Sequence, residues 1–165
     1  MEVAKDILDK LRQIPLFEDI RENEEYISQF FSICQERRVP EGQVIIKEGE
    51  RGSEMFIMLK GRVEIQRRTR AGDDYTVVML RAEDNVFFGE MALIDDDTRS
   101  ATIVATTDSE FLVITKEDFI RLGAEFPQIA LPITREIAKI LASRLRKTTG
   151  DMLTIFDALV NELQQ

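Results

Sequence analysis

The chain has 165 residues, of which 44% are hydrophobic and 32% charged, with a formal net charge of −9 and no histidine. These values fit one soluble domain with some peripheral helix, and no apolar run reaches the roughly 18 residues of a membrane-spanning helix. The missing histidine excludes imidazole-activated nucleophiles and histidine-ligated metal sites, and the acidic charge disfavours contact with nucleic-acid phosphates. We therefore expect no nucleic-acid partner and no membrane partner.

The first 38 residues are predicted to be helical. The N-terminal sequence MEVAKDILDKLRQ alternates charged and apolar residues without the apolar core of a signal peptide, so a cytoplasmic location is expected. The helical spacing that starts at Val3 is interrupted by the sequence IPLFEDI, which predicts two short helices with Pro15 at their boundary and Asn23 as the N-cap of the second. Cys34 cannot form an internal disulfide because it is the single cysteine. Its apolar surroundings, YISQFFSIC, predict a buried packing residue.

Residues 39–114 are predicted to form strands, because short β-branched segments alternate there with glycines and charged turns. The expected strands are Val44–Ile46, Met55–Leu59, Val63–Ile65, Thr76–Leu80, Ser100–Ala105 and Glu110–Ile114. Many short strands at this spacing indicate an antiparallel sandwich, barrel or jelly roll, and the periodicity alone does not separate these three folds.

The pattern becomes helical again from Thr115, which is predicted to cap a helix that runs to about Phe126. Pro132 is expected in the first turn of a longer helix, where its missing N–H costs least. That helix carries a seam with the spacing of a coiled coil, made by Leu145, Thr149, Met152, Phe156, Leu159 and Leu163. The helix could lie on its own β domain, but no later segment covers the seam, which favours self-association.

One interpretation of the segment from Phe87 to Thr102, FFGEMALIDDDTRSAT, is an anion site. Gly89 permits close backbone approach, the following residues predict a helical turn with free N–H groups, and Arg99 offers a fork of donors. Glu90 would then accept from another group, such as a sugar hydroxyl. Two alternatives stay open: a surface ion pair of Arg99 with the aspartates, worth about 0–1 kcal/mol, and an acid–base or metal site of carboxylates.

The same segment closely resembles the phosphate-binding cassette of cyclic nucleotide-binding domains. It has F-G-E-x-A-L-I, an arginine nine positions after the glutamate, and then S-A-T. The resemblance extends from about Ile14 to Leu122. It implies an α+β, mainly β fold, an eight-stranded antiparallel jelly roll flanked by N-terminal helices. Residues 1–126 would form the binding domain and residues 127–165 a C-terminal dimerisation helix.

The resemblance also implies roles for individual residues. Arg99 would bind the cyclic phosphate, Glu90 would accept from the ribose 2′-hydroxyl, and the backbones of Gly89 and Ala92 would line the turn. Ser100 would bond the phosphate or the base. A serine at this position occurs in bacterial members that bind cAMP, which favours cAMP over cGMP. The resemblance implies no metal and no further cofactor.

The approach to the arginine departs from the family pattern. Many relatives carry a glycine and a proline there, whereas this chain has Asp95, Asp96, Asp97 and Thr98. We expect the aspartates to point outward as a solvated loop. An aspartate that pointed inward would repel the phosphate and weaken binding.

The C-terminal helix resembles the dimerisation helix of the catabolite activator branch, in which two adjacent hydroxyl residues meet the adenine from both subunits. Thr148 and Thr149 in RLRKTTGDMLTIFDAL match that pair, although a threonine can also simply be tolerated in a coiled coil. Two threonines and Gly150 cost about 2 kcal/mol of helix stability relative to alanines. We hypothesise that ligand contacts offset this cost and order the helix beyond residue 148.

The sequence thus predicts a stand-alone, non-enzymatic sensor of a cyclic nucleotide, with cAMP favoured, that forms a homodimer and regulates an unknown effector protein through its C-terminal helix. Its relatives continue into a helix-turn-helix domain, whereas this chain stops at Gln165. The alternative is a jelly-roll interaction module whose pocket is vestigial or takes another anionic ligand. A metal-dependent jelly-roll enzyme is the third interpretation, and the lack of histidine weakens it.

Overall fold

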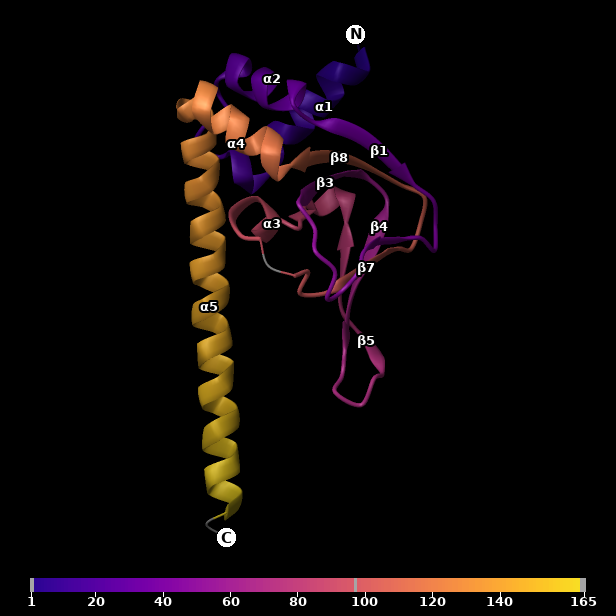
Figure 1. Cartoon of the computed structure of the whole chain (residues 1–165), viewed down its shortest axis with the longest axis vertical. Coiled ribbons are helices and arrows are strands. Elements are labelled where there is room, and N and C mark those ends of the chain that lie inside the picture. Colours follow the sequence, from indigo (N-terminus) through magenta and orange to yellow (C-terminus); the bar gives the residue numbers. More distant parts are fainter. Residues whose placement is uncertain (1, 97, 164–165) are drawn as a thin grey trace.

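The computed structural model describes residues 2–96 and 98–163 (Figure 1). The α-helices are α1 (Glu2–Gln13), α2 (Glu24–Ser32), α3 (Met91–Ile94), α4 (Lys116–Glu125) and α5 (Pro127–Leu163). The strands are β1 (Gln35–Val39), β2 (Val44–Ile46), β3 (Glu54–Lys60), β4 (Arg62–Arg68), β5 (Asp74–Arg81), β6 (Phe87–Phe88), β7 (Thr102–Ala105) and β8 (Ser109–Thr115). Two short 3₁₀ turns, Pro15–Phe17 and Ala82–Asp84, complete the elements of these residues.

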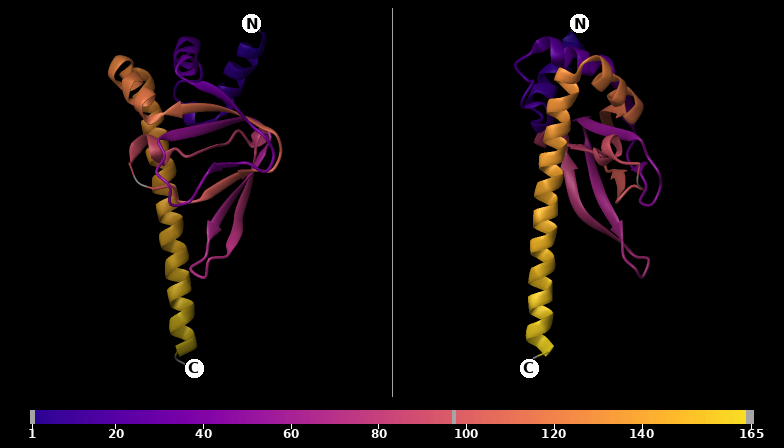
Figure 2. Two further views of the ribbon diagram at one scale, coloured as in Figure 1. Left: turned by 45° about the vertical axis from the view of Figure 1, so that its right-hand side comes forward. Right: turned by 60° about the vertical axis from the view of Figure 1, so that its left-hand side comes forward.

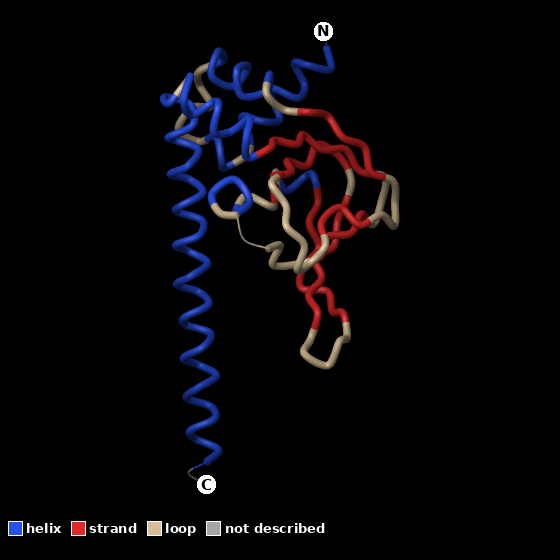
Figure 3. Tube along the Cα trace, in the orientation of Figure 1, coloured by secondary structure: helices blue, strands red, loops and turns tan. Residues whose placement is uncertain are grey.

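The described strands form two four-stranded antiparallel sheets, in the orders β1-β8-β3-β6 and β2-β7-β4-β5. They face each other across a core that includes Phe56, Phe88 and Phe111, whose rings pack with centroids 5.3 to 5.9 Å apart. Figure 3 shows the strands gathered into one body with the helices outside it. The predicted eight-stranded antiparallel jelly roll is confirmed.

The helices cover the outer face of the first sheet, so the molecule has three layers. Met55 and Ile57 of β3 point into a second core with the helices, whereas Phe56 and Met58 point between the sheets. Both faces of the central strands are therefore buried. This explains the continuous apolar sequences MFIML and FLVI, because a strand covered on both sides has no solvent face to require polar residues.

The predicted helix caps are confirmed. The Asn23 side chain accepts a hydrogen bond from the Tyr26 N–H at 3.1 Å, and Thr115 Oγ1 accepts one from the Asp118 N–H at 3.1 Å. Each cap satisfies a backbone donor that has no partner within its own helix. The break between the first two helices lies at the 3₁₀ turn that begins at Pro15, as predicted.

The structure corrects several predicted element boundaries. Residues 35–39 form strand β1 rather than the end of a helical region, and β6 is a strand that the sequence analysis did not identify. Strand β7 begins at Thr102, so Ser100 precedes it. Pro127, not Pro132, lies in the first turn of α5. Pro132 lies within the helix, where it cannot donate to the carbonyl four residues earlier.

Helix α5 has two parts with different surroundings. Its N-terminal part is buried against the helical core through Ile129, Ile133 and Ile137. Its C-terminal half is continuous through Gly150 and extends beyond the jelly roll, in the same direction as the β4–β5 hairpin (Figure 2). Apolar side chains there are exposed, as Phe156 is at 63%. None of the helices within residues 2–96 and 98–163 is both long enough and apolar enough to cross a membrane.

Cys34 is packed against the helical core but is only partly buried, which modifies the predicted full burial. Its Sγ donates to the Phe30 carbonyl at 3.4 Å. Burial, with a contribution from the charge of Asp118, raises the pKa of the Cys34 thiol to about 12. At neutral pH the thiol is therefore protonated and weakly nucleophilic, which favours a packing role.

This raised pKa predicts a loss of stability at high pH. The folded thiol holds its proton up to a pKa of about 12, whereas the unfolded thiol loses it near pH 8.5. The stabilisation is therefore complete below that pH and falls as the pH rises further. The free energy of unfolding, measured with urea, should be lower at pH 10 than at pH 7.5, and this difference should be smaller in Cys34→Ala. An equal drop in both proteins would contradict the prediction.

Candidate functional site

A cavity of about 910 Å³ lies where the jelly roll, α3 and α5 meet. Its walls are partly apolar, with residues that include Ile46, Ile65 and Leu80. Its polar groups come from residues 84–85, from the segment around α3 and from α5. The volume is in the range of small-molecule pockets, which combine an apolar lining with a few orienting polar groups.

Gly89 forms the turn into α3 in a conformation that other residues rarely adopt. Its φ is +78°, and a Cβ there would lie 2.9 Å from both the Glu54 carbonyl oxygen and Arg99 Nη1. The single turn of α3 follows, with the Ala92 N–H donating to the Gly89 carbonyl at 3.1 Å. A glycine is thus required for two reasons, its positive φ and the close approach of Arg99.

Arg99 is fixed at both its backbone and its side chain. Its N–H donates to the Glu50 carbonyl at 2.8 Å, and its carbonyl accepts from the Gly49 N–H at 2.9 Å. In the guanidinium, Nη2 donates to the Glu54 carbonyl at 2.7 Å and Nη1 approaches the Gly89 carbonyl at 3.5 Å. Both of these acceptors are uncharged, so the fork is oriented without being neutralised by them.

Two glycines allow this placement of the arginine. Besides Gly89, Gly52 lies against the side chain, because a Cβ at position 52 would lie 2.2 Å from Arg99 Nε. Burial lowers the pKa of Arg99, and the nearby charges of Glu54 and Glu90 oppose this shift. An arginine remains charged at neutral pH despite such a shift. The guanidinium is therefore a partly desolvated cation at the pocket wall.

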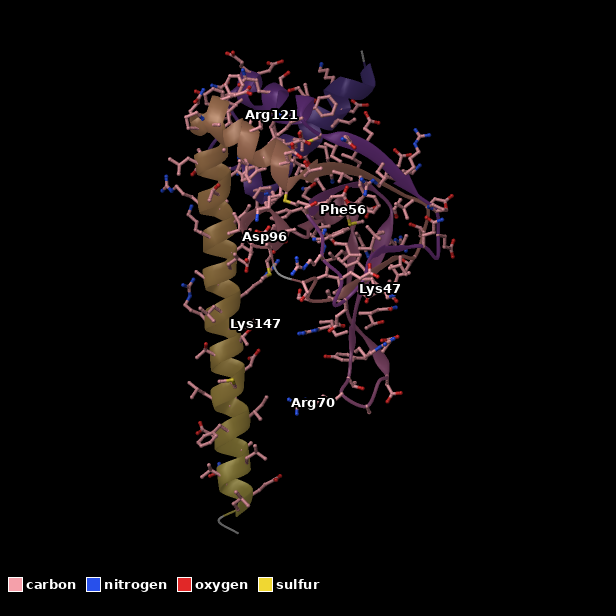
Figure 4. The ribbon with its side chains drawn as sticks, viewed as in Figure 1. Lys47, Phe56, Arg70, Asp96, Arg121 and Lys147 are labelled. Atoms are coloured by element: carbon pink, nitrogen blue, oxygen red, sulfur yellow. The ribbon has the colours of Figure 1, made fainter. Side chains whose placement is uncertain are left out.

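Glu90 is only 2% exposed and forms an ion pair with Arg144 of α5. The pair joins the α3 turn to the long helix across 54 positions of sequence. Arg144 itself lines the pocket together with its neighbour Lys147, which Figure 4 labels on α5. Arg144 was not among the predicted site residues, because in the sequence RLRK it resembles a solvated helix face. Only the folded structure shows that it reaches Glu90.

The acidic residues before Arg99 differ in their positions. Asp96, labelled in Figure 4, has a side chain 90% exposed and accepts from Lys116 Nζ at 2.6 Å. This outward orientation is the predicted one. Asp95 lines the pocket, and its Oδ1 accepts from the Asp96 N–H at 2.7 Å. The expectation for Asp97 lies outside the described residues.

The structure brings five of the predicted ligand-binding residues together at the pocket. These are Gly89, Glu90, Ala92, Arg99 and Ser100. Thr148 and Thr149 are not among its lining residues. Both are exposed on α5, and Thr149 Oγ1 donates to the Leu145 carbonyl at 2.9 Å. Their predicted contact with the adenine base involves both subunits of a dimer and therefore stays a prediction.

The arrangement suits the binding of an anion that carries neighbouring hydroxyl groups. Arg99 supplies a charged fork, and the Glu90 carboxylate can accept from a hydroxyl while Arg144 bonds it. Among residues 2–96 and 98–163, no three or more cysteine and acidic side chains are grouped so that they could hold a metal ion.

Helix α1 is anchored to one rim of the same pocket. Lys10 donates to the Ala82 carbonyl and, at 2.6 Å, to Asn85 Oδ1. Asn85 lines the pocket and has a positive φ of 54°. Burial lowers the pKa of Lys10, opposed by the charges of Glu83 and Asp84. Helix α1 therefore supports the pocket as well as the core.

The chain is similar to known cyclic nucleotide-binding proteins. The profile described as cyclic nucleotide-binding domain matches residues 36–126. The cyclic AMP receptor protein of Thermus thermophilus is 32% identical over 133 residues, which cover 81% of this chain and 58% of that protein. Human cGMP-dependent protein kinase 2 is 33% identical over 120 residues, or 72% of this chain and 15% of the kinase. The chain thus spans little more than half of the first relative and a small part of the second.

Two solved structures show the same fold. The crystal structure of the Thermus thermophilus catabolite activator protein superposes with a TM-score of 0.74 at 30% identity, over 84% of this chain and 61% of that chain. A cyclic nucleotide-binding domain from Methylobacillus flagellatus superposes with a TM-score of 0.76 at 24% identity, over 92% of this chain and 83% of that chain. With the profile match over more than half of the sequence, these findings establish that the chain belongs to the cyclic nucleotide-binding domain family.

Proposed function

We propose that the chain is a non-enzymatic sensor that binds a cyclic nucleotide, with cAMP preferred to cGMP, in the cavity beside α3. The observation that carries the proposal is the partly buried Arg99 guanidinium, held by uncharged carbonyls at the wall of a cavity of about 910 Å³. The ligand's phosphate would bind this fork. No metal or other cofactor enters the proposal.

The remaining parts of a nucleotide also have suitable partners. The ribose 2′-hydroxyl would donate to the buried Glu90 carboxylate, and the apolar walls would cover the faces of the sugar and base. Ser100 lines the pocket beside Arg99, where its hydroxyl can reach the phosphate or the base. The preference for cAMP follows from this serine and from the Thermus relative, a cyclic AMP receptor protein.

Helix α5 is proposed to transmit the binding event. Arg144 bonds the carboxylate that would receive the ribose, so a ligand at Glu90 changes the surroundings of a residue on α5. The exposed seam farther along the helix would pair with the same seam of a second copy, and Thr148 and Thr149 would meet the base from the dimer. The regulated partner would be an effector protein.

A second candidate is a jelly-roll interaction module that takes a different anion. Asp95 favours it, because this exposed residue lines the cavity that contains Arg99, and its carboxylate would oppose a phosphate bound close to it. Calorimetric titration with cAMP and cGMP separates the two. Saturable binding of cAMP, tighter than that of cGMP, supports the sensor, and no binding of either nucleotide favours the second candidate.

Replacing the arginine should abolish most of the affinity. Arg99→Ala is expected to cost about 2 to 5 kcal/mol of cAMP binding, because it removes the charged partner of a desolvated phosphate. Calorimetry measures the change directly. Arg70→Ala is the matched control, since Arg70 is exposed at the β4–β5 turn, where Figure 4 labels it, and does not line the pocket. Unchanged binding by Arg99→Ala would remove Arg99 from the site.

Ligand should also order the C-terminal half of α5. The turn of Thr148, Thr149 and Gly150 has low helix propensity, and ligand contacts there would offset its cost. Amide exchange of residues 148–160 is therefore expected to slow when cAMP is added. Residues 129–137 of the same helix, which pack on the core through Ile129, Ile133 and Ile137, serve as the internal reference. Equal protection of residues 148–160 with and without cAMP would contradict the coupling.

The exposed seam predicts a dimer that a single charge can disrupt. Phe156 is 63% exposed in the single chain, and a carboxylate buried at this position in a dimer would lack a partner. Light scattering should give the mass of a dimer for the wild-type chain and a shift toward monomer for Phe156→Asp. Thr154→Asp, on the opposite face of the helix, should remain dimeric. A wild-type monomer at all concentrations would refute the interface.

A further inference from the structure

A second ion pair lies behind the anion site. Arg37 of β1 forms a bidentate ion pair with Glu54 of β3, with Nη1 3.0 Å from Oε2 and Nη2 2.6 Å from Oε1. Such two-point pairing fixes both side chains and is stronger than a single contact. Neither residue lines the cavity that contains Arg99. The pair therefore belongs to the support of the site and not to its surface.

The Arg37–Glu54 pair lies on the inner side of the first sheet. Arg37 has the same orientation as Val39, two residues later, and Glu54 the same as Phe56, which both belong to the core between the sheets. The Arg37 guanidinium lies over the Phe56 ring, 5.5 Å from its centroid. The two side chains are 38% and 31% exposed, so both lie at the edge of this core.

Glu54 connects this pair to the anion site through its own backbone. Its carbonyl accepts the 2.7 Å hydrogen bond from Arg99 Nη2. The hydrogen bond with Arg37 lowers the pKa of Glu54, burial opposes this shift, and the charges of Arg37 and Arg99 add to the lowering. Glu54 is therefore ionised at neutral pH, next to the arginine that the ligand's phosphate would need.

We propose that Arg37 is a positioning residue of the anion site, which binds the Glu54 carboxylate and so keeps it from pairing with Arg99 or repelling an anionic ligand. The inference rests on the proposed function, because it assigns Arg37 a role in the affinity of the same pocket. Glu90 has a corresponding partner in Arg144. The two carboxylates whose charges act on Arg99 are thus each bonded to another arginine.

The test is a double-mutant cycle read by calorimetric titration with cAMP. Arg37→Gln leaves Glu54 charged without its partner and should weaken binding about tenfold at low salt, the effect of one nearby charge. The loss should shrink as salt is added, because salt screens the freed charge. Arg37→Gln/Glu54→Gln removes both charges and should bind within about threefold of wild type. Arg38→Gln is the matched control. The Arg38 side chain is 83% exposed on the same strand, so this variant should bind cAMP as the wild type does.

The outcomes separate this inference from the proposed function. Wild-type protein that binds neither cAMP nor cGMP overturns both. Wild-type binding that is unchanged in Arg37→Gln, or a loss that the double variant does not restore, overturns the role of Arg37 alone. Arg37→Lys covers the case in which Arg37→Gln is too unstable to titrate. It keeps the charge without the fork and should bind within about threefold of wild type, and a tenfold loss would overturn the electrostatic role.

Discussion

The site depends on keeping one arginine charged and available while it is partly removed from water. Burial disfavours the charge of Arg99, and nearby carboxylates favour it but would also compete with an anionic ligand. The chain meets both demands by holding the guanidinium with the neutral carbonyls of Glu54 and Gly89, while their neighbouring carboxylates bind Arg37 and Arg144. The rest of the fold keeps these groups in place.

Each of these groups comes from a different part of the fold. The sandwich supplies β1 and β3 at one side of the arginine, the turn into α3 supplies Gly89 and Glu90, and α5 reaches the turn through Arg144. The apolar start of α5 is buried in the same core as the outer face of β3. One helix is thus anchored in the core, touches the site and then extends beyond the jelly roll, which is why the proposed function assigns it the transmission of the binding event.

The sequence predicted the parts of the fold whose signals are local. Strands such as β3 and β8 are continuous apolar runs, the helix caps are single polar residues before helical patterns, and the cassette around Arg99 is one contiguous motif. Strand β1 escaped prediction because its central inward position, two residues before Val39, is Arg37, where an apolar residue would have revealed the alternation. The charge of Arg37 is paired there with Glu54, which is 17 residues away in the sequence.

The partner of Glu90 could not be predicted from a local sequence pattern either. Arg144 lies on a helix whose charged residues looked like a solvated face, and its contact exists only because α5 packs beside α3. Pro132 shows the opposite case, in which a local rule placed a proline too early, because Pro127 already occupied the helix start.

A crystal structure of the chain grown with cAMP would test the central claim most directly. The account predicts a phosphate oxygen within hydrogen-bond distance of the Arg99 guanidinium, the ribose 2′-hydroxyl at Glu90, and Glu54 still paired with Arg37. A nucleotide bound with its phosphate elsewhere, or Arg99 paired with the Glu54 carboxylate while the ligand is bound, would contradict it.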